Sequence, residues 1–224
     1  MHSIFSSKWA AAPIQKWGGI ASFLLAIAFV TSALIYLTGN LQDAMGPLTY
    51  SFADFLYGPV WAACLVTAVL ALRERIGTAA KTRMNLALLA SFAAACAFVA
   101  VASIRSSNRH YHLIHPELYL ESSVVVLTVW AVQVAGAIGA AFHFLGWAFV
   151  MIGSAGWASK RIPRILSVLY LLAGAMCLIV FLLPVMEPNA LALSVIVSIW
   201  QGFVLLNPGQ GETQASEINP NQHN

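Results

Sequence analysis

Histidine and glutamate side chains gather in one short polar segment of the chain. His110, His112 and His115 lie within six residues, and Glu117 and Glu121 follow them. Imidazole is the commonest metal ligand in proteins and suits Zn, Cu, Ni or Fe. A carboxylate could add an oxygen ligand. The segment is therefore a candidate metal site, at which a metal-dependent membrane enzyme could act.

The spacing of these three histidines matches no standard metal-binding signature. In an extended segment His110 and His112 would point to the same side, whereas on a helix His112 and His115 would share a face. The alternative is a solvated loop next to a membrane surface, and we favour this alternative. The sequence thus predicts no stoichiometric metal and no cofactor.

A second candidate is His143, within the apolar stretch "GAIGAAFHFLGWAFVMIGSAGW". Gly139, Gly146 and Gly153 recur every seven residues, which places them on one helical face, and small residues let helices approach closely in lipid. His143 shares that face, so we expect it to point into the bundle, where it either hydrogen-bonds a neighbouring helix or contacts a ligand. The candidate ligand-binding residues are His143, Trp147, Gln133, Asn85 and Gln201.

The composition determines the class of protein. Hydrophobic residues make up 60% of the 224 residues and charged residues only 8%, whereas soluble domains are about 25% charged. Long charge-free stretches predict an all-α integral membrane bundle. The six predicted spans are 19–39, 55–72, 84–104, 136–158, 165–183 and 189–206. Residues 1–18 would form an N-terminal segment, 19–206 the transmembrane domain and 207–224 a disordered tail.

The basic residues orient these spans. Nine of the eleven fall in segments on one side, and the positive-inside rule places that side, with both termini, in the cytoplasm. The nine are Lys8, Lys16, Arg73, Arg75, Lys81, Arg83, Lys160, Arg161 and Arg164. The net charge of +3 follows from this bias, so we expect membrane lipids as partners and no nucleic acid.

The stretch from Pro116 to Ala158 is too long for a single span. A seventh span near 118–135 would reverse the orientation of one half of the chain. We therefore favour an extra interfacial helix near 116–133, a position that suits Tyr119, Glu121 and Trp130. Asp54, at the outer end of the second span, could pair with Arg105 or Arg109, or lie among the lipid head groups.

The most distinctive segment is "GSAGWASKRIPRILSVLYLLAGA". It resembles the signature hairpin of a bacterial integral-membrane family known as domain of unknown function 4386. The matching residues are Gly153, Ser159, Ile162, Pro163, Arg164, Ala173 and Gly174. Ser167 stands where that family often has glycine. The resemblance implies a helical bundle in a bacterial inner membrane, and it supplies no activity.

Lys160, Arg161 and Arg164 within this segment are candidates for binding anionic lipid head groups, at about 1 kcal/mol each. The alternative is that they only fix the topology. Either role requires them to lie at the cytoplasmic surface.

Three classes of function remain. The chain has no GxSxG motif, no phosphate-binding glycine loop and no CxxC, which sets aside several enzyme classes. We favour a non-enzymatic membrane protein that binds a lipid, a hydrophobic small molecule or a partner subunit, including a second copy of itself. The alternatives are a small transporter or channel, and a metal-dependent enzyme using His110, His112 and His115. Transporters of ions usually contain more buried ionisable residues.

Overall fold

The computed structural model describes residues 13–42, 46–115 and 123–207. These residues form an all-α bundle and contain no strand, which confirms the predicted fold class. Residues 1–12, the predicted tail from 208 onward, and Glu117 and Glu121 lie outside the described residues. The longer helices are α1 (Pro13–Gln42), α3 (Trp61–Ile76), α4 (Lys81–Ile114), α6 (Ser123–Ser159), α7 (Arg164–Leu182) and α8 (Glu187–Leu206).

Short helical pieces connect the longer helices. A nine-residue helix, α2 (Pro47–Phe55), continues through a π-helical turn, η1 (Leu56–Val60), directly into α3. A 3-10 turn, η2 (Gly77–Ala80), joins α3 to α4, and Gly77 adopts a φ of 64° there, a conformation that glycine reaches without a steric penalty. A second 3-10 turn, η3 (Pro184–Met186), joins α7 to α8.

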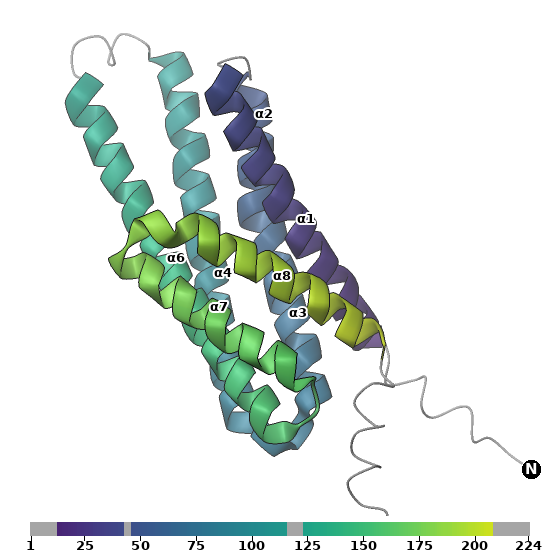
Figure 1. Cartoon of the computed structure of the whole chain (residues 1–224). Helices are drawn as coiled ribbons and strands as arrows, with labels where there is room; N and C mark the ends of the chain where they lie inside the picture. The colour runs from purple at the N-terminus through teal and green to yellow at the C-terminus, as the bar shows by residue number, and fades with distance from the viewer. Residues whose placement is uncertain (1–12, 43–45, 116–122, 208–224) are drawn as a thin grey trace, which may run out of the picture.

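Five stretches of the described chain are long and apolar enough to cross a membrane. One of them, Leu48–Tyr111, contains both α3 and α4. The chain reverses at Gly77, and these two helices lie side by side (Figure 1). With that reversal the bundle has six long helices, as the charge-free stretches predict.

The predicted interfacial helix near 116–133 is wrong for the part that the structure describes. Residues 123–133 are the first turns of α6, a single helix of 37 residues. At 1.5 Å per residue it is about 55 Å long, whereas the hydrocarbon layer is about 30 Å thick. No proline or charged residue interrupts Ser123–Ser159. The helix therefore runs past the membrane thickness and does not split into two.

The ends of the bundle differ in charge. The turns between α3 and α4 and between α6 and α7 lie at the lower end of Figure 1, where α1 also begins and α8 ends. These segments carry eight basic residues, namely Lys16, Arg73, Arg75, Lys81, Arg83, Lys160, Arg161 and Arg164. We call this the basic end and the opposite end the far end. At the far end α1, α4 and α6 extend beyond the hairpin of α7 and α8 (Figure 1).

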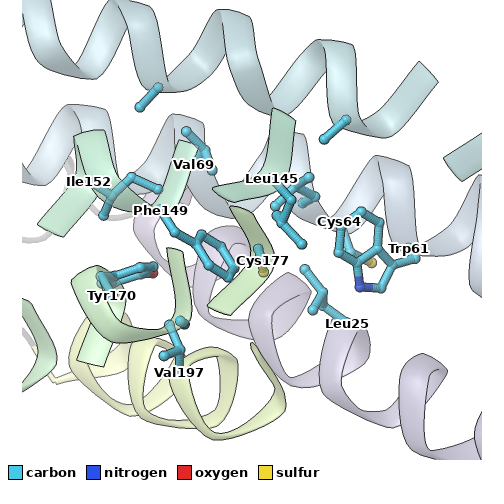
Figure 2. Packing of buried hydrophobic residues seen from close by; sticks show 14 of the residues in the cluster. Leu25, Trp61, Cys64, Val69, Leu145, Phe149, Ile152, Tyr170, Cys177 and Val197 are labelled. Carbon is cyan, nitrogen blue, oxygen red and sulfur yellow. The ribbon is translucent and has the colours of Figure 1, made fainter. Parts of the chain in front are cut away.

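Aromatic and aliphatic side chains fill the interior. Trp61 and Phe98 are fully buried with ring centroids 4.2 Å apart, and Phe29 packs against both. Tyr57 packs against Phe29 and Phe98. Farther along the bundle Phe149 packs on Tyr170, next to Ile152 and Val197 (Figure 2).

Glycines allow α6 and α7 to approach closely. A Cβ on Gly146 would lie 2.9 Å from the carbonyl oxygen of Gly174, and one on Gly153 would lie 2.8 Å from that of Ser167. Gly139, nearer the far end, has only Phe181 within 4 Å, at 3.6 Å. The prediction that these three glycines face a neighbouring helix is confirmed, and that helix is α7.

Candidate functional site

A buried ionic network connects three helices in the far half of the bundle. The Asp54 side chain is 2% exposed and forms an ion pair with Arg109 of α4. Its other carboxylate oxygen accepts a 2.5 Å hydrogen bond from the hydroxyl of Tyr36 in α1. Arg109 also donates to that hydroxyl at 3.2 Å. The pairing that the sequence suggested for Asp54 is thus made with Arg109.

The π-helical turn positions this network. Pro59 lies inside η1 and cannot donate a backbone hydrogen bond, which accommodates the wider turn. Gly58 then lies against α4, where a Cβ would be 2.4 Å from the Cβ of Ala102. The Ser32 hydroxyl donates to the carbonyl of Ala53 at 2.9 Å. Together these contacts hold Asp54 between α1 and α4. Single π-turns within helices are frequent at functional sites.

Arg105 lies one helical turn before Arg109 on the same face of α4. Its guanidinium carbon is 5.3 Å from the ring centroid of Tyr36 and 5.6 Å from that of Tyr57. Arg109 lies over Tyr50, at 5.1 Å. Within the described part of the chain Arg105 is in no ion pair and donates no hydrogen bond. Its aromatic contacts hold the side chain in place and leave its five N–H donors available.

Both arginines border a cavity of about 570 Å³. Helix α6 supplies nearly half of the lining, mostly through small or aliphatic side chains, and one wall comes from Val180 and Phe181 of α7. The complete lining is Tyr36, Tyr50, Arg105, Arg109, Trp130, Ala131, Val134, Ala135, Gly136, Ile138, Gly139, Val180, Phe181, Pro184 and Glu187. Ala131, Gly136 and Phe181 are also exposed on the outer surface of the bundle. The cavity is therefore open to the outer surface of the bundle between α6 and α7.

Glu187 enters this cavity from the hairpin of α7 and α8. It is half-buried, lies in the first turn of α8 and is attracted electrostatically to Arg105. No ion pair within 4.0 Å joins Glu187 to Arg105, so the two side chains face one cavity without forming a salt bridge. A carboxylate in the first turn of a helix is stabilised by the helix dipole.

Two N–H groups at the cavity also lack partners. The indole nitrogen of Trp130 and the Nε of Arg109 are buried without a hydrogen-bond partner among the described residues. A donor buried in this way costs about 1–3 kcal/mol. Neither nitrogen is exposed to the cavity, so the donors that the cavity offers a bound acceptor are those of the Arg105 guanidinium.

His143 lies outside this cavity. It is half-buried on α6, with Phe181 5.3 Å away between ring centroids, and it accepts a 3.2 Å hydrogen bond from the indole of Trp147. Trp147 is exposed on the outer surface of α6. The expected partners Gln133, Asn85 and Gln201 do not contact His143; its Nε2 instead accepts from the residue four positions on along the same helix.

The other candidate ligand-binding residues are dispersed. Asn85 accepts a 2.9 Å hydrogen bond from Arg73 at the basic end. Gln201 is buried, accepts from Tyr170 and donates to the carbonyl of Ala68 at 3.2 Å. Gln133 is exposed at a separate surface hollow beside α4. The structure therefore does not assemble these residues into one site with His143.

The histidine segment continues α4 toward the far end. His110 is exposed beside Ser106 and Ser107, and His115 follows the last residue of the helix. In the described residues no three His, Cys, Asp or Glu side chains come close enough to hold a metal ion. The side chain of His112 lies outside the described residues.

Lys160, Arg161 and Arg164 are exposed at the basic end. Arg75 braces the same turn: its Nε donates to the carbonyl of Arg161 at 3.3 Å, and its Nη1 donates to that of Val204 at 2.6 Å. This contact holds the turn of α6 and α7 against the end of α8. The three residues that the sequence proposes for head-group binding are therefore all accessible at the surface.

Sequence patterns did not identify the cavity. Arg105 and Arg109 are four residues apart, which on a helix signals a shared face. That spacing, together with Asp54 as a candidate ion-pair partner, was the signal in the sequence that could have indicated this site. Comparison with protein-family models, with curated proteins and with solved structures found no match. The resemblance carried by the Gly153–Ala175 hairpin stays a prediction.

Proposed function

We propose that this protein binds an amphiphilic, lipid-like molecule in the far-end cavity. The apolar part would lie against Val134, Ile138 and Val180, and the charged head would meet Arg105. The observation that carries the proposal is a half-buried guanidinium that has no acceptor among the described residues and borders an apolar cavity open to the outer surface of the bundle. Ligand sites of this kind are mostly apolar with a few placed polar groups.

The volume of the cavity supports a partly enclosed ligand. Ligand pockets measure about 300–1,000 Å³, and this one is within that range at about 570 Å³. The exposed lining residues on α6 and α7 would let the acyl chains leave sideways into the bilayer. Arg109 contributes less to the binding of the head because Asp54 already neutralises it.

The orientation belongs to the same proposal. Eight described basic residues lie at the basic end, and the positive-inside rule would place that end in the cytoplasm of a bacterial inner membrane. The cavity would then face the outer leaflet. In a Cys96→Ser background, Thr78→Cys in the turn of α3 and α4 should resist an impermeant thiol reagent in intact cells. Ser107→Cys in α4 should react. The reverse pattern would overturn the orientation.

Loss of the Arg105 charge should weaken ligand binding. Phospholipids with a fluorophore at the end of one acyl chain, carrying either phosphatidylethanolamine or phosphatidylglycerol heads, are titrated against the detergent-solubilised protein. Arg105→Gln should raise the Kd for the better-bound lipid by about tenfold or more, because a hydrogen bond to a charged group contributes about 1.5–3 kcal/mol.

The matched control is Arg83→Gln, which removes an exposed arginine at the basic end and should leave the Kd unchanged. The proposed function is overturned if neither lipid binds saturably to the wild-type protein. It is also overturned if the Arg105 and Arg83 variants bind alike.

A further inference from the structure

We propose that the far-end cavity selects a zwitterionic head group that carries a phosphate and a primary ammonium. Arg105 would bind the phosphate and Glu187 the ammonium. This inference rests on the proposed function, which requires only that an amphiphile binds. It adds the chemistry of the head group, which follows from the two opposite charges in one cavity.

Arg105 and Glu187 do not form an ion pair with each other, so both charges remain available to a ligand. Both Arg105 and Glu187 line the cavity and are half-buried, yet they are not within the 4.0 Å of an ion pair. Each also lacks a hydrogen bond to the rest of the described chain. Charges removed from water without a partner are costly. A ligand that bridges them would compensate both at once.

The neighbouring charges do not compete for these two roles. Arg109 is paired with Asp54, and that pair is completed by Tyr36. The faces of Tyr36 and Tyr50 already carry the guanidinium groups of Arg105 and Arg109. Glu187 is the one carboxylate among the described lining residues, and no ion pair occupies it, so an incoming ammonium finds its charged partner there.

The chemistry of each side chain sets the order of preference. A guanidinium presents a planar set of donors that matches phosphate oxygens bidentately. A carboxylate only accepts hydrogen bonds, so it favours a primary ammonium with three N–H donors over a quaternary ammonium with none. A purely anionic head would instead place its charge near the unpaired carboxylate of Glu187. The expected order of affinity is phosphatidylethanolamine, then phosphatidylcholine, then phosphatidylglycerol.

Head-group competition tests this order on the full-length protein. Tail-labelled phosphatidylethanolamine is displaced by each of the three unlabelled lipids at equal mole fraction in detergent micelles. Phosphatidylethanolamine should bind about tenfold more tightly than phosphatidylglycerol in the wild-type protein. Glu187→Gln should reduce this ratio to about one or below. Glu74→Gln at the basic end, where the glutamate is exposed, should leave the ratio unchanged.

The outcomes separate the two proposals. Equal binding of the three lipids to the wild-type protein overturns the head-group inference and leaves the proposed function standing. An unchanged ratio in Glu187→Gln, in protein with an unchanged melting temperature, also overturns it. Absence of saturable binding by all three lipids overturns the proposed function itself. The ratio of the affinities for phosphatidylethanolamine and phosphatidylglycerol is measured on the wild-type protein alone, so the test can be made even if a variant misfolds.

Discussion

Replacing Asp54 by asparagine is expected to cause a large loss of stability. The substitution removes the charge that compensates Arg109 inside the bundle, where the Asp54 side chain is 2% exposed and the Arg109 side chain 23%. Breaking a buried ion pair by removing one partner costs about 3–5 kcal/mol, mainly because the other charge stays buried. Unfolding of the detergent-solubilised protein by added SDS measures the change in free energy.

A double-mutant cycle isolates the pair. The double variant Asp54→Asn, Arg109→Gln should lose less stability than the sum of the two single variants, since neither charge is then left alone. Arg73→Gln is the control, because its hydrogen bond to Asn85 is exposed and should contribute less than about 1 kcal/mol. Asp54→Asn with wild-type stability would contradict the buried network.

The second large effect is expected where α6 crosses α7. In Gly146→Ala the new Cβ would lie 2.9 Å from the carbonyl oxygen of Gly174 and 2.8 Å from Leu178. Backbone cannot yield without separating the two helices. Overpacking of this kind costs about 1–3 kcal/mol. The same SDS titration should therefore show Gly146→Ala unfolding at a lower mole fraction of SDS.

Gly136→Ala provides a matched control on the same helix. Nothing lies within 4 Å of a Cβ at Gly136, and alanine favours the helix over glycine by about 1 kcal/mol. This variant should be neutral or slightly more stable. If Gly146→Ala behaved like Gly136→Ala, the close crossing of α6 and α7 would be wrong.

The spans could be predicted from the sequence because lipid allows few alternatives. A charge-free apolar stretch in a membrane must form a helix to satisfy its own backbone. The bounds of α7 and α8 follow closely from Pro163, Pro184 and Pro188, which restrict where a helix begins. The course of α6 could not be predicted this way. Apolar length alone does not distinguish the two cases, because a single helix that extends beyond the membrane has the same composition as two shorter helices.

The candidate site was harder to predict for a different reason. Tyr36, Arg105 and Glu187 come from three helices that are distant in sequence, and spacing along the chain carries no information about such a meeting. The sequence could predict only relations between nearby residues, such as the position of Arg105 and Arg109 on one face of α4. His143 is a candidate from the sequence because it is ionisable within an apolar stretch. In the fold its Nε2 accepts a hydrogen bond from Trp147, one turn away on the same helix, and the side chain lies outside the cavity.

The central claim is that an amphiphile occupies the far-end cavity, and site-resolved photo-crosslinking in lipid nanodiscs tests it most directly. The probe is phosphatidylethanolamine with a diazirine in the upper part of one acyl chain, and labelled residues are located by mass spectrometry. Labels should concentrate on 131–139 of α6 and on Val180 and Phe181 of α7, and should fall in Arg105→Gln. Labels spread evenly over exposed residues such as Ile27 and Leu89, unchanged in Arg105→Gln, would contradict the account.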